Sequence, residues 1–209
     1  MIMNIRKTIE DFPASYGACL MGTGILSITS YMYSNYLGLL KYIGFVLVLL
    51  NTLLAFIIVP LWTLKWIMYF RKVSSELSHP ILANFYPTTP IGLIILGVSY
   101  IKILGLTNIG ELLWFIGAFL TFVMGVIIPY NLFKSEALHL EHINPSFFIP
   151  PVGLIVIPIG GGIILSNLNG ELFDLGVFFN IVSWGSGFFI YLALLAVCVN
   201  RFLLLKPLL

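Results

Sequence analysis

Apolar residues fill six long stretches of this chain, and short polar segments separate them. Each stretch approaches or exceeds the roughly 20 residues that a helix needs to cross a bilayer core. Backbone groups inside lipid must be hydrogen-bonded within their own segment, so the stretches predict α-helices. The apolar residues do not alternate with polar ones, which excludes a transmembrane β-barrel. The predicted spans cover residues 13–33, 37–70, 87–104, 109–133, 150–168 and 173–205.

The composition indicates lipid as the main solvent. Of the 209 residues, 60% are hydrophobic and 9% are charged, and the mean hydropathy is +1.07. Soluble domains have roughly 45–50% apolar and 25% charged residues, so water is excluded as the main solvent. The aromatic content of 15% excludes a disordered chain. A net charge of +2, scattered along the sequence, excludes nucleic acid as a partner. We therefore predict one all-α, polytopic membrane domain over residues 1–209, with the lipid bilayer as its partner.

Lysine and arginine are distributed unequally between the two predicted sides of the membrane. Eight of the ten fall on the side that holds both termini, and only Lys41 and Lys102 fall on the other. Cytoplasmic loops collect positive charge, so we expect a multi-pass protein of the cell membrane with both termini in the cytoplasm. Trp62 and Trp66 flank Lys65 near the cytoplasmic end of the second span. This pattern predicts an interfacial aromatic belt around a lysine that extends to water.

Three residue–proline pairs, Phe12-Pro13, His79-Pro80 and Asn144-Pro145, recur at spacings of 67 and 65 residues. Each pair opens an odd-numbered span rich in Gly or Pro, whereas the even-numbered spans are more regular. The period predicts three helical hairpins. They cover roughly residues 13–70, 80–133 and 145–205.

Pro and Gly free backbone groups that lipid cannot satisfy. We therefore expect kinked odd-numbered helices inside, lining a path, and even-numbered helices outside. The alternative is the proline kinking and glycine packing found in any membrane bundle. The predicted kinks lie at Pro13, Pro80, Pro87, Pro90, Pro145, Pro150, Pro151 and Pro158.

Acidic residues are missing from the middle of every predicted span. An intramembrane carboxylate usually marks a proton relay or a cation site, so the pattern argues against both. An anion can instead be held by helix N-termini and by Ser and Thr hydroxyls. Helices broken at proline are predicted to supply such N-termini at membrane depth. The candidate hydroxyl donors are Thr23, Ser27, Thr88, Thr89 and Ser146. The aromatic candidates for narrowing the path, with helix packing as the alternative, are Phe85, Phe147 and Phe148.

In this order and spacing, four groups of residues resemble the tellurite-resistance/dicarboxylate transporter family. That family includes bacterial TehA, fungal malate permeases and the plant guard-cell slow anion channels, and the similarity covers essentially the whole chain. The groups are Asp11-Phe12-Pro13 with Met21-Gly22-Thr23-Gly24, His79-Pro80 with Asn84-Phe85-Tyr86-Pro87, Asn144-Pro145 with Phe148-Ile149-Pro150-Pro151-Val152-Gly153, and Arg201-Phe202 with Lys206-Pro207-Leu208.

The resemblance implies ten helices in five hairpins around a central pore, assembled as trimers. It implies passive or proton-coupled movement of small anions, with C4-dicarboxylates such as malate first among them. It adds motif residues to the predicted path, namely Gly22, Gly24, His79, Asn84 and Asn144. Three hairpins fit this chain, so we expect the first three-fifths of a family member. Its expected partners are further copies of itself or a second polypeptide that supplies the missing hairpins. We predict no enzyme activity and no cofactor.

Three other interpretations stay open. An aquaporin-like channel also has six spans, but it needs two Asn-Pro motifs and Asn144-Pro145 is the one such pair. An intramembrane serine protease would use Ser186, but no histidine follows it in the sequence. The third is a transporter fragment or a membrane scaffold that does not transport on its own.

The loop before residue 144 contains residue types that bind zinc. His139 and His142 are three positions apart, and Glu136 and Glu141 accompany them. We favour a solvated polar loop over a metal site.

Overall fold

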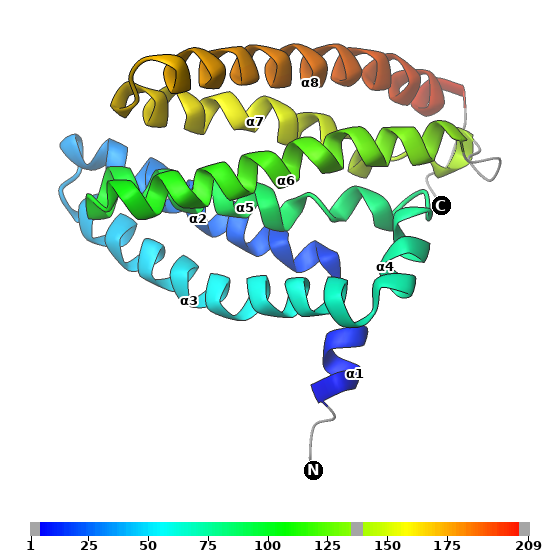
Figure 1. Ribbon diagram of the computed structural model, residues 1–209, viewed down its shortest axis with the longest axis horizontal. Helices are drawn as coiled ribbons and strands as arrows, with labels where there is room; N and C mark the ends of the chain where they lie inside the picture. The colour runs from blue at the N-terminus through cyan, green and yellow to red at the C-terminus, as the bar shows by residue number, and fades with distance from the viewer. Residues whose placement is uncertain (1–4, 135–139, 205–209) are drawn as a thin grey trace.

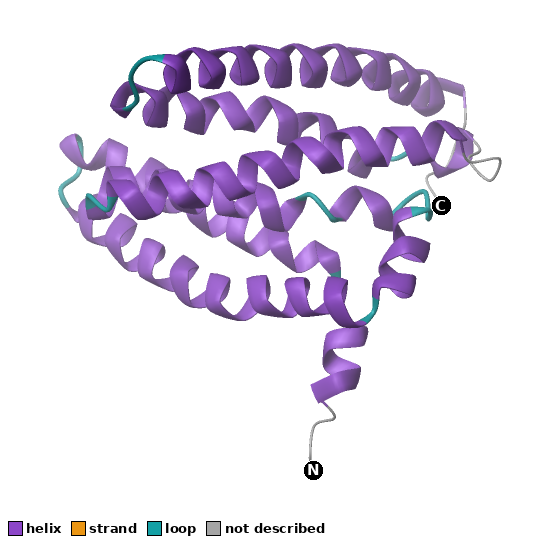
Figure 2. Cartoon of the chain, in the orientation of Figure 1, coloured by secondary structure: helices purple, strands orange, loops and turns teal. Residues whose placement is uncertain are grey.

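The computed structural model describes residues 5–134 and 140–204, and the regular elements within them are all helical (Figure 2). The chain is therefore all-α, as its apolar pattern predicts. The α-helices are α1 Ile5–Glu10, α2 Gly17–Met32, α3 Leu39–Met68, α4 Phe70–Leu77, α5 Thr88–Ser99, α6 Thr107–Lys134, α7 Ile149–Ile164 and α8 Glu171–Leu204. The 3-10 turns are η1 Ala14–Tyr16, η2 Tyr33–Asn35, η3 Leu82–Phe85, η5 Leu140–His142, η6 Pro145–Phe148 and η7 Leu165–Asn167. A π-helical turn, η4, covers Tyr100–Leu104.

Five helical stretches are long and apolar enough to cross a membrane, by length and composition. They are Leu39–Met68, Leu82–Leu104, Thr107–Lys134, Pro145–Ile164 and Glu171–Leu204. The first predicted span is also helical, but its α-helix, α2, has 16 residues and lies between the 3-10 turns η1 and η2. Sixteen residues of α-helix rise about 24 Å, which is less than a bilayer core of about 30 Å.

Helix α5 forms the centre of the molecule. All twelve of its residues are buried, and it contacts α2, α3, α6 and α7. The most extensive helix contacts join α2 to α3, α5 to α6, and α7 to α8. Figure 1 shows α8 along one edge of the bundle and α3 along the opposite edge.

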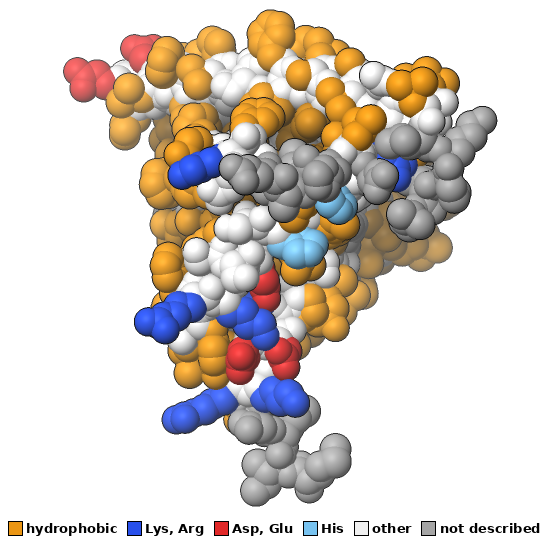
Figure 3. Space-filling model, turned by 90° about the vertical axis from the view of Figure 1, so that its right-hand side faces the viewer, with side chains coloured by type: hydrophobic (Ala, Val, Ile, Leu, Met, Phe, Trp, Pro, Cys, Tyr) orange, Lys and Arg blue, Asp and Glu red, His pale blue; other side chains and the backbone are white. Residues whose placement is uncertain are grey.

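Helices α3, α6 and α8 carry long rows of exposed apolar side chains. Phe56, Phe119 and Phe178, one from each helix, are examples. Lipid tails are as apolar as these side chains, so such surfaces suit helices that face a bilayer. The charged residues gather elsewhere: Figure 3 looks onto the end of the bundle near α4, where several Lys and Arg side chains lie.

The second apolar stretch ends earlier than predicted. Helix α3 stops at Met68, because Tyr69 leaves the helical region with φ −128° and ψ 41°. The chain then continues as the short polar helix α4, whose Val73 and Leu77 are buried. At the opposite end, η4 is followed by Gly105 at φ +70°, a left-handed conformation that glycine adopts without a Cβ clash.

Candidate functional site

The three residue–proline pairs open helices in the same way. Pro13 precedes η1 and then α2, Pro80 precedes η3 and then α5, and Pro145 opens η6 and then α7. Proline lacks an N–H, and the first N–H groups of a helix have no intrahelical acceptor, so proline is well tolerated there. The sequence period is thus visible as a repeated local structure of proline, 3-10 turn and α-helix.

Most of the prolines predicted as kinks lie at these openings. Pro87 precedes the first residue of α5 and Pro90 lies in its first turn, while Pro150 and Pro151 lie in the first turn of α7. Among the eight, Pro158 is the one that lies beyond the first turn of its α-helix.

Side-chain hydrogen bonds join the three openings. Thr88 Oγ1 lies 2.8 Å from the carbonyl oxygen of Ala14 and 2.7 Å from that of Phe85; its one proton is shared between these two acceptors, and the contact with Ala14 ties α5 to η1. Asn84 Nδ2 donates to the carbonyl oxygen of Pro80 (2.9 Å) and to Ser146 Oγ (3.2 Å), and so ties η3 to η6. The N-terminal ends of α2, α5 and α7 therefore lie together at one end of the bundle.

Several other predicted path residues belong to this group of openings. Asn144 Oδ1 accepts from the Ser146 backbone N–H (2.9 Å) and caps η6. Thr89 is buried, and its Oγ1 has no hydrogen-bond partner among the described residues. Phe147 is buried and Phe148 is half-buried against Tyr191, with 5.1 Å between ring centroids. Phe85 is half-buried and packs against the apolar core.

The path residues of α2 lie apart from this group and face different ways. Gly22 is exposed, whereas Gly24 is buried against Asn51 and Ile95. Ser27 Oγ donates to the Gly24 carbonyl oxygen (2.7 Å) and lies 3.4 Å from Ser99 Oγ. Thr23, between the two glycines, is half-buried.

His79 serves the turn in which it lies. Its side chain is exposed, and its Nδ1 accepts from the backbone N–H groups of Ile81 (3.2 Å) and Leu82 (3.3 Å). These bonds organise the turn between α4 and η3.

Buried polar side chains inside the spans were missed by reasoning from sequence. Asn51 is fully buried in α3, and neither atom of its amide group has a hydrogen-bond partner among the described residues. Thr121 in α6 and Ser183 in α8 are also fully buried without a described partner for their hydroxyls. Buried polar groups are usually hydrogen-bonded. A lone amide within a long apolar run is the sequence signal that marks Asn51.

Lys65 does not extend to water, so that part of the prediction is wrong. Its residue exposure is 3%, and its Nζ donates to the Phe12 carbonyl oxygen (2.9 Å) and to Glu76 Oε2 (2.7 Å) and Oε1 (2.9 Å). Tyr86 donates through its hydroxyl to Glu76 Oε2 (2.6 Å). The helix break at Tyr69 brings Glu76 back onto α3, and its carboxylate compensates the buried ammonium.

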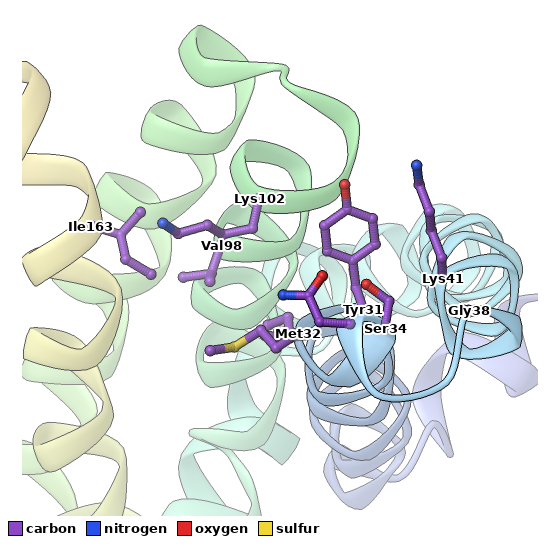
Figure 4. A pocket seen from close by; sticks show the side chains of 10 residues that line it. Tyr31, Met32, Ser34, Gly38, Lys41, Val98, Lys102 and Ile163 are labelled. Carbon is purple, nitrogen blue, oxygen red and sulfur yellow. The ribbon is translucent and has the colours of Figure 1, made fainter.

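A pocket of about 710 Å³ lies at the other end of the bundle, where α2, α5 and α7 end (Figure 4). Its walls come from the C-terminal part of α2, the start of α3, the end of α5 with η4, and the end of α7. We call it the lysine pocket, because Lys41 and Lys102 both line it. Its other polar lining residues are Tyr31, Ser34 and Asn35.

Comparison with known proteins identifies the family. Residues 11–208 match the family model described as SLAC1, voltage-dependent anion channel. The chain belongs to the voltage-dependent anion channel family. This match confirms the resemblance drawn from the residue–proline motifs, and it makes the chain a multi-pass membrane protein of a transporter family and not an enzyme.

Three relatives of this voltage-dependent anion channel family member have names that refer to transport. Two uncharacterized transporters of Methanocaldococcus jannaschii are 46% and 45% identical to it over 204 and 200 residues. The malic acid transport protein of Schizosaccharomyces pombe is 24% identical over 207 residues. These matches cover 98%, 96% and 95% of this chain, but 60%, 58% and 47% of the relatives. The chain thus spans about three-fifths of the length of the two archaeal proteins.

Some predicted features fall outside the described residues. Glu136 and His139 of the polar loop lie there, as do Leu205 at the end of the sixth predicted span and the motif residues Lys206 and Pro207.

Proposed function

We propose that this chain provides the anion path of a membrane transporter or channel for small anions, with C4-dicarboxylates such as malate as the first candidates. The observation that carries the proposal is the meeting of three proline-opened helix starts around the neutral polar side chains Asn84, Thr88 and Ser146. Helix N-termini and hydroxyls favour anions without needing a buried charge. The sequences of α2, α5 and α7 contain no Asp, Glu, Lys, Arg or His, which supports a path built from neutral groups.

The proposed arrangement has six spans in three hairpins. The helices α2, α5 and α7 are the inner ones, and α3, α6 and α8 are the outer ones. Complete burial of α5 and the apolar surfaces of α3, α6 and α8 support this division. We further propose that both termini are cytoplasmic and that the pore is completed by further helices or by other copies of the chain, as in a trimer.

Malate is first among the proposed substrates because the fungal relative is named a malic acid transport protein. At 24% identity, that name supports C4-dicarboxylates as a substrate class more strongly than it supports malate itself. The second candidate is a transporter fragment that moves nothing by itself, and the coverage of 60% of the archaeal relative favours it.

Reconstitution into liposomes tests the proposal. The purified chain is expected to move radiolabelled malate, or failing that nitrate or chloride, above the rate of empty liposomes. Replacing Asn84 or Ser146 by Ala is expected to lower the flux about two- to tenfold, the effect of one hydrogen bond worth roughly 0.5–1.5 kcal/mol. Leu192→Ala, on the exposed face of α8, is the matched control and should transport normally.

The longer archaeal relative provides the comparison that separates the two candidates. If the relative transports in the same liposomes and the folded shorter chain moves no anion, the fragment interpretation is correct. Equal flux from the Asn84→Ala, Ser146→Ala and control variants would contradict the role given to the helix openings.

A further inference from the structure

We infer that the lysine pocket is an anion-binding vestibule that collects small carboxylates or oxyanions through Lys41 and Lys102. Its contribution to transport rests on the proposed function, but binding of anions at the pocket can be measured without transport. The pocket is formed where the three Pro- and Gly-rich helices end together. Ile28 and Tyr31 come from α2, Val98 from α5 and Ile163 from α7. A pocket at this position lies on the route of any anion that enters or leaves between these helices.

The charge of the pocket has one sign. Both lysines are exposed, and neither side chain has a hydrogen bond or ion pair with any of the described residues. No Asp or Glu lines the pocket. The described carboxylates at this end of the bundle, Glu111, Glu171 and Asp174, lie at the starts of α6 and α8 and outside the lining.

The position of the two lysines runs against the charge distribution of the chain. They are the two positive residues on the side that is otherwise free of Lys and Arg, and both line the same pocket. An orienting role does not explain this, because positive charge on that side opposes the orientation set by the other eight. A role in attracting anions explains both their presence and their place in the lining of one pocket.

The lining offers several hydrogen-bond donors to an anion. Figure 4 shows Lys102 directed toward Ile163 and the Tyr31 hydroxyl lying between Lys102 and Lys41. Ser34 and Asn35 add a hydroxyl and an amide donor on the same wall. Like charges in a concave, partly apolar wall focus the potential and raise the local concentration of counter-ions. The Debye length is about 8 Å at physiological ionic strength, so salt should weaken this effect.

A cysteine reporter measures the potential of the pocket directly. Met32 is exposed, lines the pocket and carries no polar group, so Met32→Cys leaves the proposed donors in place. The background is Cys19→Ala, because Cys19 is exposed, while Cys198 is buried and can remain. The full chain in detergent is treated with a sulfonate-bearing and a trimethylammonium-bearing methanethiosulfonate, and the ratio of the two rates is recorded.

Removing both lysine charges should change that ratio. With Lys41→Gln and Lys102→Gln, the rate of the anionic reagent relative to the cationic one is expected to fall about fivefold at low salt. The difference between the two rate ratios should shrink in 0.5 M salt, because the Debye length is then only a few ångströms. Lys41→Arg with Lys102→Arg should keep the original ratio. The matched control is Lys7→Gln with Arg71→Gln, which removes two exposed charges at the other end. An unchanged ratio in the Lys41/Lys102 variant, or an equal fall in the control, would overturn the inference.

The same variants connect the vestibule to transport. In liposomes, the Lys41/Lys102 glutamine variant is expected to raise the apparent KM for malate several-fold with little change in maximal rate. If the unmodified chain moves no anion, the proposed function fails. The ratio of the two reagent rates still shows whether the pocket attracts anions. If transport occurs and both KM and the ratio are unaffected, the vestibule fails and the transport function stands.

Discussion

At the scale of single residues, two glycines of α2 differ in what surrounds them. A Cβ at Gly17 would lie 2.5 Å from Thr88 Oγ1 and 2.6 Å from the Thr88 carbonyl carbon, whereas a Cβ at Gly22 would meet no atom within 4 Å. We expect Gly17→Ala to destabilise the protein by about 1–3 kcal/mol, because backbone at the α2–α5 junction must move. Gly22→Ala should stay within about 0.5 kcal/mol of the original. Thermal unfolding in detergent measures both, and equal midpoints would show that this junction is not tightly packed.

The buried ion pair makes a second prediction at this scale. Lys65→Met removes the partner of Glu76 and leaves a carboxylate whose side chain is only 19% exposed. We expect a loss of about 3 kcal/mol, the lower end of the range for broken buried pairs. The double variant Lys65→Met, Glu76→Gln should recover much of that loss, since no unpaired charge remains. Lys72→Met, which breaks a more exposed pair with Asp11, is the control and should cost little. A double variant no more stable than the single one would argue against a charge effect.

At the scale of elements, the sequence predicts well where the helices lie along the chain, and poorly which elements contact one another. Long apolar runs predict the positions of α3, α5, α6, α7 and α8, and the proline period predicts which helices open alike. The contact of Asn84 with Ser146 joins residues 62 positions apart, and no periodicity in the chain encodes it. The Lys65–Glu76 pair was missed for a related reason: hydropathy detects the end of α3 but not the direction in which α4 returns.

The segment before η1 is tied to α4 by a pair that makes a pH prediction. The hydrogen bond from Lys72 Nζ to Asp11 Oδ1 (2.6 Å), and the positive charge beside it, hold the pKa of the Asp11 carboxyl below its ordinary value of 3.8. The same bond raises the pKa of Lys72 above 10.5. The tie should therefore persist between these values, and be lost as pH falls through the lowered Asp11 pKa or rises through the raised Lys72 pKa.

NMR titration of the Asp11 carboxyl measures this directly. Lys72→Met is expected to return its pKa toward 3.8, because the hydrogen bond and the neighbouring charge are both removed. Lys7→Met, which removes a weaker charge interaction, should raise the pKa less. A titration that is the same in all three proteins would show that Lys72 does not hold this carboxyl.

At the scale of the whole molecule, the candidate path is only partly predictable. The sequence indicates neutral donors near the helix starts, and Asn84, Thr88, Asn144 and Ser146 do share hydrogen bonds or backbone contacts there. It does not reveal that Gly22 and Gly24 face different surroundings, or that Lys41 and Lys102 line one pocket. Those facts depend on the rotation of each helix about its axis and on where α2, α5 and α7 end relative to one another. Both are determined by the packing of the helices.

Orientation in the membrane gives the last prediction. The end with α1 and α4 carries most of the Lys and Arg, and the end with the lysine pocket carries two, so the first is expected to be cytoplasmic. Tyr36, 86% exposed in the turn between α2 and α3, and Ser75, exposed on α4, report on the two ends. In the Cys19→Ala background, Tyr36→Cys should react with a membrane-impermeant maleimide on intact cells, and Ser75→Cys only after permeabilisation. The reverse pattern would mean the opposite orientation and would place the lysine pocket on the cytoplasmic side. Two lysines on that side agree with the positive-inside rule, so the reason to single them out would weaken.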